Sequence, residues 1–232
     1  VPTNGGLVNP VEAIGAVARE HDIFYIVDAC QSAGQLVLDV DAIQCAVLTA
    51  AGRKCLRGPR GVGFLYVRGA VLDSLHPPMI DLFSARWSAP DEYELRADAR
   101  RFENWESNYA AKLGLGRALE YALDIGIDVI ETEVSRLSAL LRGELAAVPG
   151  VTVQDIGAHQ CGIVTFSVEG VAATTIEKQL RENRILVSVS SPASTLIDAR
   201  RRQLPDLVRS GVHYFNLESE LDALAAVVRS CR

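Results

Sequence analysis

The chain has 232 residues, 49% of them hydrophobic, and a formal net charge of −6 at pH 7. This length suits one large domain followed by a smaller one. The acidic balance argues against a nucleic-acid partner, because phosphate backbones select broadly basic surfaces. No apolar run approaches the ~20 residues of a membrane span, so no membrane partner is expected. Five cysteines lie apart without a C-x-x-C pair, which predicts free thiols in a reducing cytoplasm.

The first third of the chain alternates helical and strand patterns, which is typical of α/β proteins with β-α-β units. Apolar, β-branched runs are bounded by turn residues, and an Asn-Pro pair opens the first helical pattern. The expected elements are a helix capped by Asn9 and ending near His21, a buried parallel strand at 23–27, a short helical turn near Asp41, strands at 45–48 and 63–67, and a short helix at 71–75.

From residue 76 to residue 103 the periodicity fails, so we expect a long surface excursion of the functional or interfacial kind. Clear helical and strand patterns return after it, and they indicate a linking helix and a small α+β domain. The expected domains are 1–126, part of a large domain, and 127–232. The expected elements are helices at 109–125 and 128–148, strands at 151–153 and 163–168, a helix at 174–183, strands at 185–189 and 209–214, and a final helix capped by Asn216.

Three polar side chains follow strand ends. Asp28 ends the strand predicted at 23–27, Gln31 stands in the next turn, and Lys54 follows the strand predicted at 45–48. Ligands of open α/β sheets bind at the carboxyl ends of the strands. A carboxylate keeps a pyridinium ring protonated and able to accept electrons, and an amine near other positive charge loses its proton readily enough to attack an aldehyde. The pattern therefore predicts a pyridoxal-phosphate site.

Each of these residues also has an ordinary structural interpretation. A strand-end aspartate is commonly a cap, a turn glutamine is commonly solvated, and a lysine beside arginines is commonly part of a basic surface. No structural need explains the three together, and positive charge and glycine-rich backbone around the lysine suit a phosphate. No metal-ligand spacing is present. The candidate phosphate ligands are Arg53, Arg57, Arg60 and the loop amides around Gly58, Gly61 and Gly63.

The pieces D-x-x-Q (28–31), R-K (53–54) and G-P-R-G-x-G-F-L-Y (58–66) resemble the class V aminotransferase family of pyridoxal-phosphate enzymes, which includes cysteine desulfurases, C–S lyases and isopenicillin N epimerase-like proteins. The resemblance covers nearly the whole chain, as the C-terminal two-thirds of the usual family chain. It implies fold type I, in which a large domain with a mostly parallel sheet is followed by a small α+β domain. It also implies a homodimer.

The resemblance assigns a role to each residue of the site. It implies that Lys54 forms the Schiff base with the cofactor, that Asp28 holds the pyridine nitrogen, and that Gln31 contacts the ring oxygen. Arg53 is assigned to cofactor binding. Transamination, C–S cleavage and epimerisation of an amino acid all remain open, and so does a non-catalytic homologue that folds and dimerises without turnover.

The chain departs from the family at several positions. Ala51 and Val62 stand where the family often has hydroxyls, and Trp105-Glu106 stands where the desulfurase branch has Gly-Thr, so the phosphate site must differ in detail. The stretch Ser190-Ser191-Pro192-Ala193 stands where desulfurases carry a mobile cysteine. It predicts that the protein is not a persulfide-forming cysteine desulfurase.

One further residue is assigned by resemblance. The segment RSGVHYFNLESELD, which begins at Arg209, resembles the family's R-x-S-x-x-x-Y-N-T-x-x-E-[IV]-D, in which the arginine binds the α-carboxylate of the substrate. A guanidinium suits that role because its planar fork grips a carboxylate with two hydrogen bonds. The alternative is a structural ion pair between Arg209 and Asp206.

Overall fold

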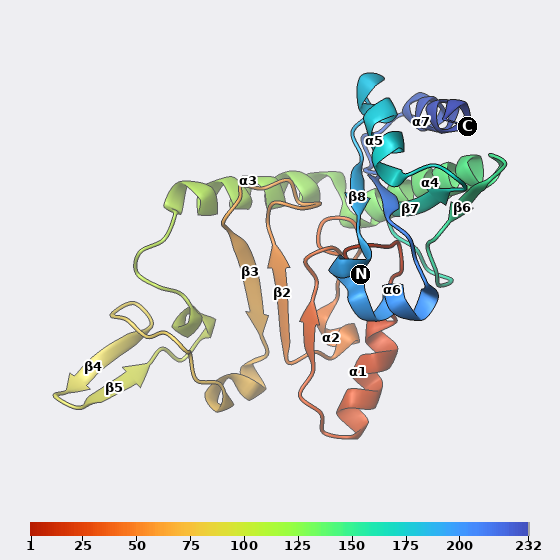
Figure 1. The fold of residues 1–232 in the computed structure, drawn as a ribbon. Helices are drawn as coiled ribbons and strands as arrows, with labels where there is room; N and C mark the ends of the chain where they lie inside the picture. Colours follow the sequence, from red (N-terminus) through yellow and green to blue (C-terminus); the bar gives the residue numbers. More distant parts are fainter. Residues whose placement is uncertain (232) are drawn as a thin grey trace. The chain divides into compact units, whose positions relative to one another are not determined.

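The computed structural model describes residues 1–231, which form two compact units (Figure 1). The Lys54 unit comprises Pro10–Ala33 and Leu38–Asp124. The Arg209 unit comprises Val1–Asn9, Gly34–Val37 and the chain from Ile125 onward. The assignment of domains to 1–126 and 127–232 stays a prediction. No helix among residues 1–231 is long and apolar enough to cross a membrane.

The Lys54 unit contains a three-stranded sheet of order β1-β2-β3. The first two strands are parallel, with Asp28 opposite Thr49, and the third is antiparallel to β2, with Ala51 opposite Gly63. The parallel pair therefore ends at the edge of the sheet where Asp28 and the chain leading to Lys54 lie. The elements of this part are α1 (Val11–Glu20), β1 (Ile26–Asp28), α2 (Val40–Ile43), β2 (Val47–Ala51), β3 (Gly63–Val67) and η1 (Gly69–Ser74).

The prediction of a buried strand at 23–27 was wrong in its bounds and burial. The strand covers Ile26–Asp28, and the side chains of Ile23, Phe24 and Ile26 are exposed. Among the described strands β1 pairs only with β2, so it lies at an edge of the sheet. The helix α1 begins one residue after Pro10 and shows no side-chain cap, so the predicted Asn9 cap is not formed.

The predicted excursion has more regular structure than expected. It contains a hairpin of β4 (Ala85–Ala89) and β5 (Glu92–Leu95), followed by η2 (Ala99–Phe102). The Asp81 carboxylate links the chain before the hairpin to the chain after η2. Its Oδ1 accepts the backbone N–H of Phe83 at 2.8 Å, and its Oδ2 accepts that of Trp105 at 2.7 Å. The helix α3 (Tyr109–Ile125) follows with the predicted bounds.

The Arg209 unit contains a second sheet, of order β6-β7-β9-β8, in which every neighbouring pair is antiparallel. Its core joins α4, α5 and α7 to this sheet through fully buried side chains such as Leu141, Phe166 and Ile176. This is the α+β arrangement that the sequence predicted. The elements are α4 (Ile127–Ala146), β6 (Val151–Val153), β7 (Ile163–Val168), α5 (Ala173–Glu182), β8 (Ser188–Ser190), η3 (Pro192–Thr195), α6 (Leu196–Arg202), β9 (Leu207–Gly211) and α7 (Glu218–Ser230).

Two strands of this unit are displaced from their predicted positions. The strand predicted at 185–189 covers Ser188–Ser190, and the one predicted at 209–214 covers Leu207–Gly211, because the two pair with each other in the register Ser190 to Leu207. The final helix begins at Glu218. The Asn216 amide donates to the Glu220 carboxylate, which also accepts the backbone N–H of Leu217, so Glu220 caps this helix and Asn216 supports it.

Candidate active site

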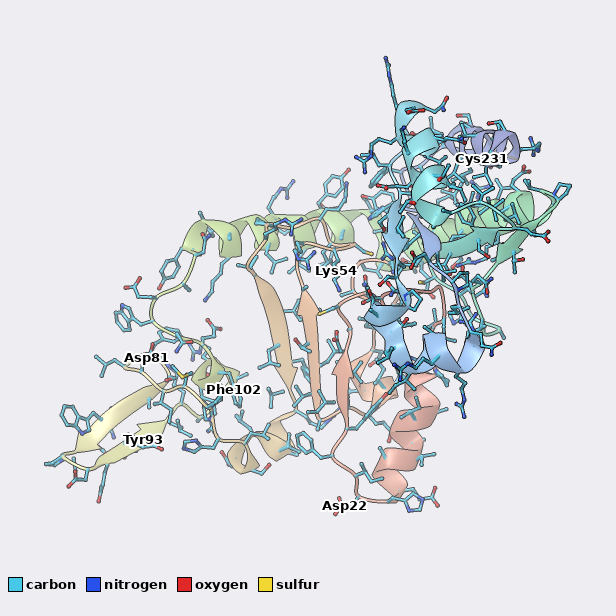
Figure 2. All side chains as sticks on the ribbon, viewed as in Figure 1. Asp22, Lys54, Asp81, Tyr93, Phe102 and Cys231 are labelled. Atoms are coloured by element: carbon cyan, nitrogen blue, oxygen red, sulfur yellow. The ribbon has the colours of Figure 1, made fainter. Side chains whose placement is uncertain are left out.

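The carboxyl ends of β1 and β2 lie next to each other, because the two strands are parallel. Asp28 is the last residue of β1, and Lys54 stands three residues beyond the end of β2. Figure 2 shows Lys54 at this end of the sheet and Asp22 at the opposite end. The loop that carries the lysine is closed by backbone hydrogen bonds from Gly52 to Val62 at 3.0 Å and from Gly58 to Gly52 at 2.8 Å. The strand pairing and this loop thus place Asp28 and Lys54 at one edge.

The Asp28 carboxylate is kept ionised by its surroundings. Its Oδ1 accepts the backbone N–H of Cys30 at 2.8 Å. That hydrogen bond is the main reason why the pKa of Asp28 lies below its usual value; the Cys30 thiol and the positive charge of Lys54 lower it further. Asp28 is exposed, so its carboxylate can reach a ligand. A charged acceptor of this kind is what the nitrogen of a pyridinium ring requires.

Lys54 differs from the other two lysines of the chain. Lys112 pairs with Glu103 at 2.7 Å, and Lys178 lies 4.0 Å from Glu182. Within residues 1–231, the Lys54 ammonium has neither a hydrogen bond nor an ion pair, although it is close enough to Asp28 to lower the pKa of that carboxyl. Its side chain is half-buried. Lys54 is therefore the lysine with an amine available for covalent chemistry.

The remaining members of the predicted cofactor site lie around the same loop. Gln31 is buried, and its backbone carbonyl accepts the Cys55 thiol at 3.9 Å. Arg53, Arg57 and Arg60 are all exposed, and the Arg57 guanidinium also lies 5.3 Å from the centre of the Tyr121 ring. All three arginines stay candidates for binding a phosphate.

Two glycines of this loop have local roles that the sequence did not reveal. The Gly58 N–H donates to the Gly52 carbonyl, so this one amide is already used, while the other loop amides around it stay candidates for a phosphate. A Cβ at Gly63 would clash with the Ala50 carbonyl oxygen, which shows that the close packing of β3 on β2 requires glycine there. Gly61, with φ of 82°, has open space around it and stays a candidate.

Arg209 lies on β9 in the other unit and is half-buried. Its Nε donates to the Thr3 carbonyl oxygen at 2.8 Å, which fixes the guanidinium on the N-terminal segment. The neighbouring residue Asn4 accepts the Ser190 hydroxyl on Oδ1 at 2.9 Å. The Asn4 Nδ2 is buried and has no hydrogen-bond partner among residues 1–231. No local signal in the sequence distinguishes Asn4 from any other asparagine before glycine.

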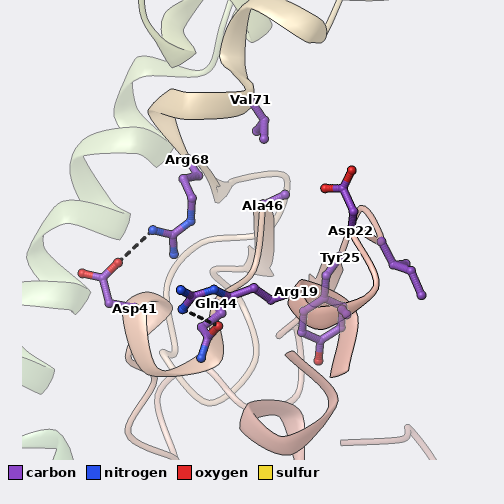
Figure 3. A pocket seen from close by; sticks show the side chains of 10 residues that line it. Arg19, Asp22, Tyr25, Asp41, Gln44, Ala46, Arg68 and Val71 are labelled. Atoms are coloured by element: carbon purple, nitrogen blue, oxygen red, sulfur yellow. Dashed lines mark hydrogen bonds and ion pairs between the residues drawn. The ribbon is translucent and has the colours of Figure 1, made fainter. Parts of the chain in front are cut away.

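Charged residues also meet at the opposite end of the first sheet, around a cavity of about 540 Å³ (Figure 3). Arg68 donates there from Nη1 to Asp41 at 2.9 Å, from Nε to the Cys45 carbonyl at 3.0 Å, and from Nη2 to the Val40 carbonyl at 2.7 Å. Arg19 donates to the Gln44 amide oxygen at 3.2 Å. The protein itself uses these groups, so we assign this cavity no site.

The cysteines and histidines form no metal site in the described part of the chain, where no three His, Cys, Asp or Glu side chains group together. Cys161 is fully buried, and burial raises the pKa of its thiol. It is a core residue.

The profile of a known family, described as Aminotransferase class-V, matches residues 1–224. The chain belongs to the class V aminotransferase family. Similar curated proteins include a probable cysteine desulfurase of Pyrococcus abyssi, 28% identical over 98% of this chain, and a cysteine desulfurase of Salmonella choleraesuis, 29% identical over 95% of this chain. The chain spans about half the length of these relatives, 58% and 54% respectively.

Solved structures of similar proteins confirm the predicted fold type. The apo structure of a cysteine desulfurase from Thermococcus onnurineus NA1 matches with a TM-score of 0.92 and 26% identity, over 99% of this chain and 57% of that one. A mutant of the cystine C–S lyase C-DES, with glycine covalently linked to its PLP cofactor, matches with a TM-score of 0.84 and 30% identity, over 99% of this chain and 58% of that one. The chain has the fold of part of the large domain followed by the small α+β domain, as predicted.

Proposed function

We propose that the protein is a pyridoxal-phosphate enzyme that acts on an amino acid and binds the cofactor covalently through Lys54. The observation that carries this proposal is the amine of Lys54, which alone among the three lysines has no ion-pair partner within residues 1–231 and which stands near the ionised Asp28. The family match and the PLP cofactor of the C-DES mutant support the choice of cofactor.

The residues present fit this cofactor. A carboxylate held in its charged form suits a pyridinium nitrogen, and an amine without an ion-pair partner suits an aldehyde. When bound, pyridoxal phosphate supplies an acceptor for the electrons that are left at the substrate Cα when a bond there breaks. Asp28 would hold the pyridine nitrogen, Gln31 would lie at the ring oxygen, and Arg53 would bind the phosphate. Lys54 would take the proton from the Cα and return it.

We propose that Arg209 binds the α-carboxylate of the amino acid. The hydrogen bond from Nε to Thr3 supports this role, because it fixes the plane of the guanidinium before any ligand arrives. The buried Nδ2 of Asn4, in the residue next to Thr3, adds a donor without a protein partner in the described chain. Arg209→Lys should weaken amino-acid binding, because an ammonium cannot replace the planar fork.

Borohydride reduction tests the covalent link. Treating the cofactor-loaded full-length protein with borohydride should fix the cofactor on a lysine, and mass spectrometry of the peptides should locate it on Lys54. Lys54→Ala should lose both the label and the visible absorbance band while keeping its circular dichroism. Lys112→Ala, which removes a lysine paired with Glu103, is the matched control and should keep both. A label on Lys112 or Lys178 would refute the assignment.

We further propose that the protein is not a persulfide-forming cysteine desulfurase. The segment that begins at the last residue of β8 reads Ser190-Ser191-Pro192-Ala193, and its serine hydroxyls cannot carry a sulfur atom as a thiol does. The relatives are named cysteine desulfurases, and the C-DES structure contains cysteine persulfide as its product, so the segment bears on the reaction type. Incubation with cysteine, followed by mass spectrometry, should show no sulfur added to any of the five cysteines.

The alternative is a homologue that folds and dimerises without turnover. It would bind no cofactor covalently, so a full-length protein without a visible band after incubation with pyridoxal phosphate would favour it. A homodimer and a cytoplasmic location stay predictions. Sedimentation of the full-length protein tests the first of them.

A further inference from the structure

The loop that carries Lys54 packs against the helix α3, which crosses the end of the sheet where β2 finishes (Figure 1). The Leu115 side chain comes so close to the loop that a Cβ at Gly52 would lie 2.7 Å from it. A Cβ at Gly114, on the helix, would lie 2.8 Å from the Pro59 ring. Both distances are shorter than the roughly 3.5 Å at which carbon atoms pack. Glycine is therefore required on both sides of this contact.

Arg57 has an unusual backbone conformation within this loop. Its φ of 59° lies in the left-handed region, which residues other than glycine rarely adopt. Its N–H donates to the Lys54 carbonyl at 2.8 Å, which closes the turn that carries the lysine. A residue with a side chain keeps such a conformation only where its surroundings determine it. Contacts from outside the turn must therefore hold Arg57.

The helix α3 supplies one such contact through Tyr121. The Arg57 guanidinium lies 5.3 Å from the centre of the Tyr121 ring, within the about 6 Å over which an aromatic face attracts a cation. The ring is 48% exposed, so it is not part of the buried core. Its contact with Arg57 links the helix to the turn that carries Lys54.

We propose that Tyr121 is a positioning residue that holds Arg57 and, through Arg57, the turn from which the Lys54 amine is presented. The inference rests on the proposed function, since it concerns the lysine that binds the cofactor. Tyr121 itself touches neither cofactor nor substrate. By keeping the guanidinium on α3 it keeps Arg57 in its left-handed conformation, and the hydrogen bond from Arg57 then fixes the Lys54 carbonyl. An amine held in place beforehand reaches an aldehyde more often in the reactive geometry.

Two aldehydes separate this role from phosphate binding. Pyridoxal and pyridoxal phosphate share the aldehyde that joins a lysine amine with loss of one water, but pyridoxal has no phosphate. The cofactor-free full-length protein is mixed with each, and borohydride reduction at successive times, followed by mass spectrometry of the peptides, gives the rate at which Lys54 is labelled. Tyr121→Leu should slow both aldehydes by the same factor, roughly two- to fivefold, as expected for one exposed cation–π contact. Tyr121→Phe keeps the ring face and should retain the parent rates.

Further variants decide whether Tyr121 acts through Arg57. Tyr109→Leu is the matched control, because Tyr109 lies on the same helix and its ring faces the Lys112 ammonium at 5.9 Å; it should leave both rates unchanged. In a double-mutant cycle, Tyr121→Leu should have no further effect on pyridoxal once Arg57→Met has removed the charge. Amide hydrogen exchange at Arg57 in the cofactor-free protein should be faster in Tyr121→Leu and unchanged in Tyr109→Leu.

The outcomes separate this inference from the proposed function. A parent protein in which neither aldehyde labels Lys54 overturns both. A parent that labels Lys54, with equal rates in Tyr121→Leu, overturns only the inference. A Tyr121→Leu variant that is slowed with pyridoxal phosphate but not with pyridoxal also overturns it, because the tyrosine would then act on phosphate binding. Unchanged rates together with a lower melting temperature overturn it as well, since the contact would then be purely structural.

Discussion

The two ends of the β1–β2–β3 sheet both carry charged side chains, but the protein uses them differently. At the end where β1 and β2 finish, Lys54 has no ion-pair partner in the described chain, and Asp28 accepts hydrogen bonds only from Cys30. At the other end, the Arg68 guanidinium makes three hydrogen bonds to Asp41 and to two backbone carbonyls. Saturated charges stabilise a fold, whereas charges with unused hydrogen-bonding capacity are available to a ligand.

The cavity volumes alone would not have made this distinction. The cavity at the Arg68 end measures about 540 Å³, which is large enough for an organic molecule, and it is lined by two arginines and two aspartates. However, the charged groups that line it bind one another and nearby backbone atoms. The same comparison separates Lys54 from Lys112 and Lys178, whose ammonium groups face carboxylates. Unused hydrogen-bonding capacity, rather than charge or cavity size, thus distinguishes the proposed site from the Arg68 end.

The largest expected effect comes from neutralising one carboxylate at each end of the sheet in turn. Asp28→Asn should slow exchange of the Cα hydrogen of an amino-acid substrate with solvent deuterium at least about 100-fold, because a fixed charge that stabilises the reacting centre is lost. Asp41→Asn, at the other end, should leave the exchange rate unchanged. Proton NMR of the substrate in deuterated buffer measures both. Equal rates for Asp28→Asn and the parent would contradict the assigned role of Asp28.

The next largest effect is on the stability of the fold and comes from the Arg68 end of the sheet. Arg68→Ala should lower the free energy of unfolding by about 2 kcal/mol, because the carbonyls of Val40 and Cys45 lose their donors. The lysine-bound cofactor should be unaffected. Arg53→Ala, at the Lys54 end, should change the free energy of unfolding by less than about 0.5 kcal/mol, as for an exposed residue, but weaken cofactor binding. Urea denaturation and cofactor titration measure the two quantities.

If Arg68→Ala weakened cofactor binding and Arg53→Ala destabilised the fold, the difference between the two ends would be refuted. Arg68→Lys is a useful intermediate. It keeps one donor and the charge opposite Asp41 but loses the fork that reaches two carbonyls, so it should recover only part of the lost stability.

Elements with strong local signals could be predicted from the sequence. The bounds of α3, β3, β6 and β7 agree with the predicted ranges, because apolar periodicity and the stops at Gly126 and Pro149-Gly150 determine them locally. The β4–β5 hairpin could not be predicted, because distant contacts support it: Asp81 binds the Trp105 backbone, and the buried Arg101 donates to the Leu72 carbonyl at 3.0 Å.

The candidate site likewise has features that the sequence could predict and features that it could not. Spacing along the chain was enough to propose Asp28, Gln31 and Lys54, since strand ends and turns place them. The sequence could not show which lysine lacks a carboxylate partner, since Lys112 and Glu103 are nine positions apart and meet only in the folded chain. The Asn4–Ser190 bond joins two residues that lie 186 positions apart in the sequence, and no local pattern connects them.

The smallest expected effect concerns the charge interaction within the Lys54 end. The pKa of Asp28 is held below its usual value first by the Cys30 backbone N–H, then by the Cys30 thiol, and also by the Lys54 charge. In the cofactor-free protein, Lys54→Ala should therefore raise the pKa of Asp28, although it should stay below the usual value because the backbone hydrogen bond remains. Carbon-13 NMR of the labelled carboxyl group measures it.

The effect on stability has a definite sign. A carboxyl whose pKa is lower in the folded chain stabilises the fold above its unfolded pKa of about 3.9 and loses that contribution as the pH falls through the folded pKa. Because Lys54→Ala brings the two pKa values closer, the variant should lose less stability than the parent over that acidic interval. Lys112→Ala should leave the titration of Asp28 unchanged, since Lys112 faces Glu103. If instead Lys54→Ala left the pKa of Asp28 where it is and Lys112→Ala moved it, the wrong lysine would have been placed beside the carboxylate.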